Sequence, residues 1–202
     1  MLRRSLVACA ALSAALLSAP GLAQTVGQSA PALALKDSAG KLVNLADFRG
    51  KTVVLEWVNP SCPFVKKHYG AGNMQATQKA AAGDGVVWLS VSSTHPGHAD
   101  YKQPAELASW MQQQGSGASA LLMDDDGKVG KAWGARTTPH LYVVNPAGTL
   151  VYAGAIDSKP SANPADIPAA TNYVRQTLGE LKAGQAVSKP SSTPYGCSIK
   201  YS

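Results

Sequence analysis

The chain has 202 residues, of which 45% are hydrophobic and 15% are charged, and its formal net charge is +6 at pH 7. This length and balance are typical of one soluble globular domain with a sizeable core. Because the basic residues are scattered and no run of five like charges occurs, we expect no nucleic-acid surface.

Residues 1–23 are predicted to be a signal peptide. Arg3 and Arg4 form a basic start, residues 6–17 form an apolar segment, and residues 21–23 form a small-residue cleavage site. The apolar segment is too short to span a bilayer as a helix. We therefore expect an exported protein, periplasmic or secreted, with the general secretory and twin-arginine routes both open.

The first half of the remaining chain indicates a hairpin, a buried strand and a helix that opens at a cysteine. The hairpin spans residues 33–45 around a turn at 38–41. The run 52–58 is apolar on both faces, which is typical of a central parallel strand. Pro63 suits the first turn of the next helix, and glycines at 70 and 72 predict that this helix kinks or restarts at Asn73.

The second half alternates strands with helices. Its predicted elements are a strand at 85–91, a helix at 104–115, a strand at 121–123, a short helix at 129–133, strands at 140–144 and 149–155, and a last helix ending near Lys182 that buries Ile167, Val174, Leu178 and Leu181. This order predicts an α/β fold with a central mixed sheet flanked by helices. We expect one domain over 24–182 and a flexible tail over 183–202.

Cys62 stands at the predicted start of a helix. The unpaired N–H groups and the macrodipole at that end favour an anion, so a thiolate there is a candidate nucleophile. Lys66 lies one helical turn further and adds positive potential. Cys197 is the only other cysteine after residue 23, and an even pair in an oxidising compartment is a candidate disulfide, either redox-active or inert.

Four motifs carry a resemblance to a known superfamily. A strand followed by Cys62 at a helix start resembles the active-site arrangement of the thioredoxin superfamily. Residues 45–55 resemble the entry segment of redoxin and peroxiredoxin-type domains, Thr138-Pro139 resembles the cis-proline loop, and residues 194–201 resemble the tail of a peroxiredoxin-like subgroup. The resemblance covers roughly residues 25–202 and implies a thioredoxin-like fold with thiol redox chemistry that needs no cofactor.

The chain departs from both branches of this resemblance near Cys62. Thioredoxins carry a second cysteine three residues later, where this chain has Val65, so a local dithiol cycle is impossible. Typical peroxiredoxins carry threonine three residues before the cysteine, where this chain has Asn59. The Asn59 amide can donate to a developing oxyanion. Cys197 then becomes the candidate that resolves oxidised Cys62.

Glu56 is a carboxylate in the middle of an apolar strand, six residues before Cys62. Burial of a carboxylate is costly unless the group is paired or protonated. Thioredoxins keep a buried acid at this offset as a proton shuttle, whereas the alternative is an ion pair with a lysine or with Arg136. By resemblance, Arg136, Thr138 and Pro139 belong to a substrate-binding loop opposite Cys62.

Other polar residues offer less specific signals. Lys67 and His68 are predicted to be solvated residues on the helix face. The turn at 124–127, Asp-Asp-Asp-Gly, lacks the later ligands and the closing glutamate of an EF-hand, so we predict a solvated turn. His95, His98 and His140 are candidate metal ligands and suggest a metal site as an alternative. By resemblance, however, a copper-delivery protein of this fold needs a second cysteine at the position of Lys66. We predict no metal site.

The sequence thus predicts an exported thiol oxidoreductase of the peroxiredoxin-like kind. Cys62 attacks a peroxide or a protein disulfide, and Cys197 or an external thiol reductant regenerates it. Two alternatives stay open: a binding module with a structural Cys62–Cys197 disulfide that presents the Pro139 groove to a partner, and a copper-delivery protein. The sequence does not indicate an oligomeric state.

Overall fold

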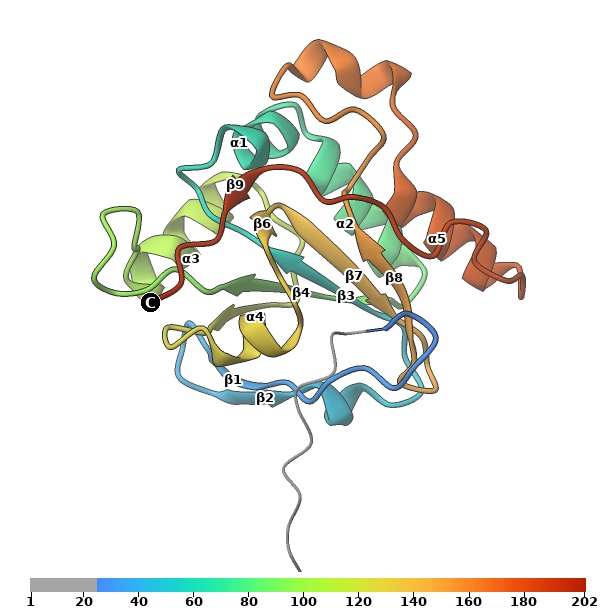
Figure 1. Cartoon of the computed structure of the whole chain (residues 1–202), viewed down its shortest axis with the longest axis horizontal. Helices are drawn as coiled ribbons and strands as arrows, with labels where there is room; N and C mark the ends of the chain where they lie inside the picture. Colours follow the sequence, from blue (N-terminus) through green and yellow to red (C-terminus); the bar gives the residue numbers. More distant parts are fainter. Residues whose placement is uncertain (1–24) are drawn as a thin grey trace, which may run out of the picture.

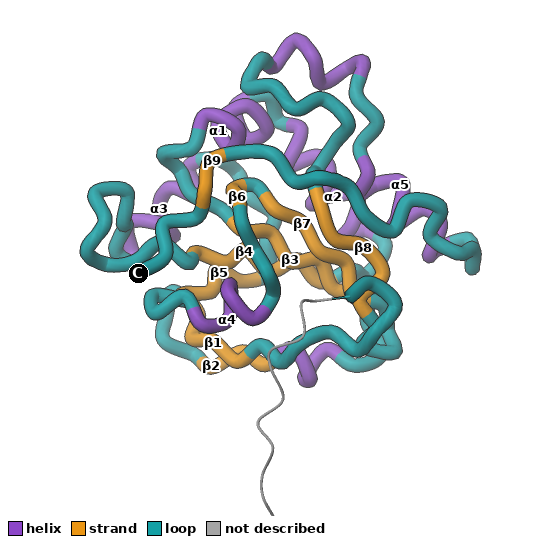
Figure 2. Tube along the Cα trace, viewed as in Figure 1, coloured by secondary structure: helices purple, strands orange, loops and turns teal. Residues whose placement is uncertain are grey.

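The computed structural model describes residues 25–202, and the predicted signal peptide lies outside that range. Its centre is a seven-stranded mixed sheet in the order β2-β1-β5-β4-β3-β7-β8, accompanied by a two-stranded sheet of β6 and β9 (Figures 1 and 2). The strands are β1 (Ala34–Asp37), β2 (Leu42–Asn44), β3 (Val53–Trp57), β4 (Val87–Ser92), β5 (Ala120–Met123), β6 (Thr137–Thr138), β7 (His140–Val144), β8 (Leu150–Gly154) and β9 (Cys197–Ser198).

Residues 25–202 also form five α-helices and two short 3-10 helices around the large sheet. They are η1 (Leu45–Phe48), α1 (Pro63–Gly70), α2 (Asn73–Gly83), α3 (Pro104–Gln113), α4 (Lys128–Ala132), η2 (Pro164–Ala169) and α5 (Tyr173–Lys182). Within residues 25–202, no helix combines the length and the apolar character needed to cross a membrane. The predicted α/β fold, with its N-terminal hairpin of β1 and β2 and its flanking helices, is confirmed.

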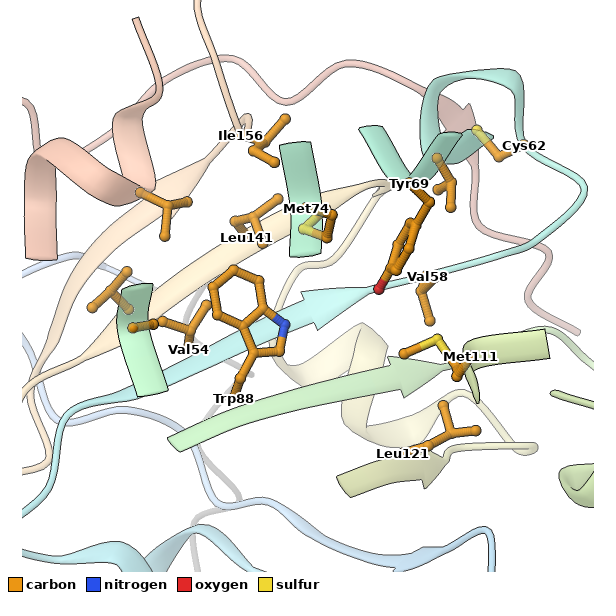
Figure 3. Packing of buried hydrophobic residues seen from close by; sticks show 14 of the residues in the cluster. Val54, Val58, Cys62, Tyr69, Met74, Trp88, Met111, Leu121, Leu141 and Ile156 are labelled. Carbon is orange, nitrogen blue, oxygen red and sulfur yellow. The ribbon is translucent and has the colours of Figure 1, made fainter. Parts of the chain in front are cut away.

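The central strands are buried on both faces, as their apolar runs predict. All residues of β3, β4 and β7 are buried, and β3 pairs in parallel with β4 and antiparallel with β7. Val54 and Trp88 point to the side covered by α1, α2, α3 and α5, which Figure 3 shows. Leu55 and Trp57 point to the opposite side, where they pack with Trp133 and with the N-terminal hairpin.

The helix after Cys62 restarts, and the last helix is shorter than predicted. Gly72 has a φ of 69° and separates the end of α1 from the start of α2, so the predicted break is confirmed. The prediction for Ile167 is wrong, because this residue lies in η2 and not on α5. Asn172 accepts a hydrogen bond from Arg175 N at 3.0 Å and starts α5 as its N-cap residue.

The C-terminal segment follows a defined path over the domain, where the sequence predicts a flexible tail. We call residues 189–202 the strap. Its first part pairs with Ala153 of β8, whose amide donates to Pro190 O at 3.2 Å and whose carbonyl accepts from Ser192 N at 3.2 Å. Its second part forms β9, which lies beside β6 (Figure 2). Backbone pairing therefore holds the strap at two edges of the domain.

The acidic turn after β5 is less solvated than the sequence predicts. Asp124 is buried, and its carboxylate accepts hydrogen bonds from Ser93 Oγ at 2.5 Å, Gly130 N at 2.8 Å and Val129 N at 3.1 Å. Asp126, by contrast, is exposed and pairs with Lys128. Asp124 therefore joins β4 to the first turn of α4.

We expect Asp124→Ala to lower the free energy of unfolding by about 2 kcal/mol, because three donors, two of them buried, lose their acceptor. Asp126→Ala is the matched control in the same turn, and its exposed ion pair predicts a much smaller change. Urea denaturation of both variants measures the difference. Equal effects of the two substitutions would contradict this role of Asp124.

Candidate active site

Cys62 is presented by a tight turn between β3 and α1. Asn59 shapes this turn: its Oδ1 accepts from Ser61 N at 2.8 Å, its carbonyl accepts from Cys62 N at 3.1 Å, and its Nδ2 donates to Thr94 Oγ1 at 3.1 Å. Cys62 is the N-cap residue of α1, and Pro63 fills the first helical position. The amide of Asn59 keeps one hydrogen unused in this network, so its predicted donation to an oxyanion stays a prediction.

The thiol of Cys62 faces the loop that precedes β7. Its Sγ donates to the carbonyl oxygen of Thr138 at 2.9 Å, and only 2% of the residue is exposed. The Thr138–Pro139 peptide bond is cis, as the resemblance predicts. The hydroxyl of Thr138 is buried without a hydrogen-bond partner in the described part of the chain. The loop thus places a backbone oxygen within hydrogen-bond distance of the sulfur.

Cys197 approaches the same loop from the strap. It pairs with Thr138 in the β6–β9 ladder, and both cysteines are free thiols. Figure 3 shows Cys62 beside the ribbon of β9. Burial raises the pKa of Cys197 well above its ordinary value, and a hydrogen bond to Cys62 and the charge of Cys62 raise it further. Cys197 is therefore protonated at neutral pH, next to Cys62.

Glu56 lies in the core of the sheet and has only neutral partners. Its Oε2 accepts hydrogen bonds from Trp88 Nε1 at 2.8 Å, Tyr69 Oη at 3.1 Å, Ser90 Oγ at 3.2 Å and Gln78 Nε2 at 3.3 Å. Figure 3 shows Tyr69 directed from α1 toward the sheet. Within residues 25–202, Glu56 forms no ion pair, so the predicted pairing with a lysine or Arg136 is not found.

Burial raises the pKa of Glu56 to about 7, because desolvation outweighs the four hydrogen bonds that lower it. Its other oxygen, Oε1, is buried and has no hydrogen-bond partner in the described region. A carboxyl group in this state exchanges its proton near neutral pH. That property suits the proton shuttle that the resemblance implies, and the geometry ties it to α1 through Tyr69.

The side chains of Lys66 and Arg136 are exposed near the site. Lys66 is exposed on α1, and its ammonium group has no hydrogen bond or ion pair within residues 25–202. The side chain of Arg136 is likewise exposed and unpaired in the described region. Its carbonyl oxygen, however, accepts from Ile199 N at 3.0 Å and so anchors the strap. The predicted roles of both side chains stay predictions.

The prediction that Lys67 and His68 are solvated is wrong. Both side chains are buried, because the loop after β8 and the strap cover this face of α1. Their neighbours are Asp157 of that loop and Tyr195 of the strap. No local pattern marks this cluster, since Tyr195 lies 127 positions from His68 in the sequence. The adjacent Lys-His pair close to the candidate nucleophile was the one available signal.

The histidines have other partners in the described part of the chain. Within residues 25–202, no group of three or more His, Cys, Asp and Glu side chains is placed to hold a metal ion. His95 and His98 use their Nδ1 atoms to accept from the backbone amides of Gly97 and Asp100. His140 is buried against Tyr142, with ring centroids 4.4 Å apart.

Comparisons with known proteins support the fold and the family. The model of the AhpC/TSA family matches residues 26–153. The "Putative peroxiredoxin" of Mycobacterium tuberculosis (strain ATCC 25618 / H37Rv) is 32% identical over 119 residues, which are 58% of this chain and 69% of that protein.

Solved structures resemble the chain over most of its length. A hypothetical protein of Sinorhizobium meliloti 1021 has a TM-score of 0.74 at 24% identity and covers 89% of this chain and 96% of its own. The thioredoxin domain of a thiol-disulfide oxidoreductase of Bacteroides vulgatus has a TM-score of 0.52 at 22% identity, over 73% of this chain and 98% of its own. The fold is therefore thioredoxin-like, and the chain belongs to the AhpC/TSA family.

Proposed function

We propose that the protein is an exported thiol peroxidase in which Cys62 is the nucleophile and Cys197 is the resolving cysteine. The observation that carries the proposal is the meeting of both free thiols at Thr138, beside the cis peptide bond. Membership of the AhpC/TSA family supports thiol-dependent redox chemistry in general. The export rests on the predicted signal peptide at residues 1–23.

The cycle has three balanced steps. The Cys62 sulfur attacks one peroxide oxygen, the O–O bond breaks, and an alcohol or water leaves with the proton while Cys62 becomes a sulfenic acid. The Cys197 sulfur then attacks the Cys62 sulfur, the S–O bond breaks, and water leaves as the disulfide forms. An external thiol reductant supplies two electrons and two protons to restore both thiols, and no cofactor is required.

The small size of a peroxide favours it over a protein disulfide as the oxidant. Only 2% of Cys62 is exposed, and β9 occupies the edge of β6 next to it. An extended polypeptide would need that same edge for backbone pairing and would first have to displace the strap. A peroxide molecule needs only a narrow path to the sulfur.

The proposal predicts distinct products for two cysteine variants. After a pulse of hydrogen peroxide, the reduced parent protein should lose the mass of two hydrogens and contain a Cys62–Cys197 disulfide. Cys197→Ser should instead gain one oxygen on Cys62, which dimedone traps as sulfenic acid. Cys62→Ser should react with neither peroxide nor dimedone. Intact-mass analysis and peptide mapping measure these products.

Ser198→Ala is the matched control, because it changes an exposed strap residue next to Cys197 and leaves both thiols in place. It should form the disulfide as the parent does. Peroxide consumption by Cys62→Ser at the parental rate would overturn the proposal. Disulfide formation with an oxidised peptide but not with peroxide would contradict the choice of substrate.

A further inference from the structure

Three buried ionisable residues gather around one tyrosine of the strap. Lys67 and His68 come from α1, Asp157 comes from the loop after β8, and Tyr195 comes from the strap. The side chains of Lys67, His68 and Asp157 are almost fully inaccessible to solvent. We call these four residues the latch. None of them takes part in the three steps described above.

The hydrogen bonds of the latch converge on the Tyr195 hydroxyl. Tyr195 Oη donates to Asp157 Oδ1 at 2.5 Å and lies 3.1 Å from His68 Nε2. Because the only hydroxyl hydrogen goes to Asp157, His68 Nε2 is the donor to Tyr195. His68 Nδ1 then accepts from Asn73 Nδ2 at 2.8 Å, which fits a neutral imidazole.

Lys67 completes the latch from its other side. Its Nζ lies 3.8 Å from Asp157 Oδ2, donates to Lys159 O at 3.1 Å, and lies 5.6 Å from the centre of the Tyr195 ring. Apolar side chains could fill the same volume at similar stability, since burial of an ion pair is costly. Directional bonds, however, specify one position of the tyrosine, which apolar contacts alone do not.

Only a short stretch of chain joins the latch to the resolving thiol. Cys197 is two residues after Tyr195, and a chain of two residues spans at most about 7 Å. On the far side of Cys197, Tyr201 Oη donates to Ala135 O at 2.9 Å. Gly130 leaves room for that ring, because a Cβ there would lie 2.9 Å from Tyr201 Cε1. Cys197 is thus held between two anchored tyrosines.

We propose that Tyr195 is a positioning residue for the second step: its hydroxyl, bonded to Asp157 and His68, holds Cys197 against Cys62. The inference rests on the proposed function, because it assigns the latch to disulfide formation. Because the strap is already docked, the Cys197 thiol lies near the Cys62 sulfenic acid before the second step begins. The latch residues take no part in the first step, in which only Cys62 and peroxide react.

Tyr195→Phe tests this assignment, because it removes the hydroxyl and keeps the ring, whose centroid lies 5.7 Å from that of Phe64. We expect disulfide formation to slow by about tenfold or more, because misplaced reacting groups lose rate steeply. Sulfenic acid formation should keep the parental rate, and dimedone trapping should rise. Stopped-flow fluorescence and quenched mass analysis separate the two steps.

Ser188→Ala is the matched control. It removes another hydrogen bond from a hydroxyl of the C-terminal segment to a carboxylate, that of Glu180, outside the strap. Both of its steps should match the parent. An unchanged second step in Tyr195→Phe, or an equal fall of both steps, would overturn the positioning role.

Hydrogen exchange gives a readout that does not depend on peroxide chemistry. In the reduced protein, Tyr195→Phe should speed exchange of the Ile199 amide, which donates to Arg136 O, by about tenfold, and leave β3 amides unchanged. An unchanged exchange rate at the Ile199 amide would contradict the claim that the Tyr195 hydroxyl holds the strap in place. If the parent never forms the disulfide, the proposed function is contradicted. Faster exchange at Ile199 in Tyr195→Phe would still show that the latch holds the strap in place.

Discussion

Gly196→Ala is expected to release the strap from Cys62 and to abolish rapid formation of the Cys62–Cys197 disulfide, with the seven-stranded sheet still folded. Gly196 has a φ of 142°, a backbone conformation that side chains disfavour. A Cβ at this position would overlap the Thr138 carbonyl oxygen and lie 3.3 Å from Pro139 N. These are backbone atoms, so they cannot move aside as a flexible side chain can.

The expected loss is about a hundredfold in the rate of disulfide formation, because the Cys197 sulfur leaves its reactive position. Quenched mass analysis after a peroxide pulse measures it, and accumulation of sulfenic acid should accompany it. Circular dichroism should show an intact domain, since the atoms nearest to the added Cβ belong to Thr138 and Pro139, outside the seven-stranded sheet.

Gly134→Ala is the matched control for the backbone strain. Gly134 also has a positive φ, 62°, but a Cβ at that position would have no heavy atom within 4 Å beyond its chain neighbours. This variant should lose about 1–2 kcal/mol of stability from backbone strain and still form the disulfide at the parental rate. Parental disulfide formation in Gly196→Ala would show that close approach at Thr138 does not hold the strap.

Glu56→Gln is expected to remove the pH dependence of stability that Glu56 imposes. The pKa of Glu56 is about 7 in the folded protein and 4.5 without burial. Between these values the folded state binds more protons than the unfolded state, so the free energy of unfolding falls as the pH rises. The parent should lose about 3 kcal/mol across this window, while glutamine, which does not titrate, avoids the loss.

Urea denaturation in the presence of reductant at pH 5, 6, 7 and 8 measures this effect. The stability of Glu56→Gln relative to the parent should increase from pH 5 to pH 7 and level off by pH 8. Glu106→Gln is the control, because Glu106 is exposed on α3 and its ion pair with Lys102 predicts a change within about 0.5 kcal/mol. A parallel pH dependence of parent and Glu56→Gln would contradict a raised pKa at Glu56.

The same variant also tests the proton shuttle. Removal of the exchangeable proton should slow disulfide formation or its reduction while the domain stays folded. If only the unfolding curves move and both rates are unchanged, Glu56 has a structural role alone.

Short-range sequence patterns predicted the parts of this molecule that local physics determines. An apolar run specified β3, the proline after Cys62 specified the start of α1, and Gly72 marked the restart at α2. The resemblance added the cis bond before Pro139. Each of these features depends on residues within a few positions of one another.

The latch and the path of the strap escaped prediction for the opposite reason. Lys67 and His68 look like surface residues, and they become buried only because Asp157 and Tyr195 arrive from distant parts of the chain. Proline and serine in the tail suggested a flexible segment, but backbone pairing with β6 and β8 depends on the completed sheet. Tertiary contacts determine both the burial of the latch residues and the path of the strap, and no local sequence pattern indicates such contacts.

The strap also affects how the protein behaves toward its own copies. A strand at the rim of a sheet exposes unpaired N–H and C=O groups that invite pairing with another molecule. Residues 190–192 cover the rim at β8, and β9 covers β6. Proteolytic removal of the strap is expected to leave the backbone groups of Ala153 and of β6 without these partners. In addition to carrying Cys197, the strap therefore pairs with backbone at two edges where another copy of the chain could otherwise pair.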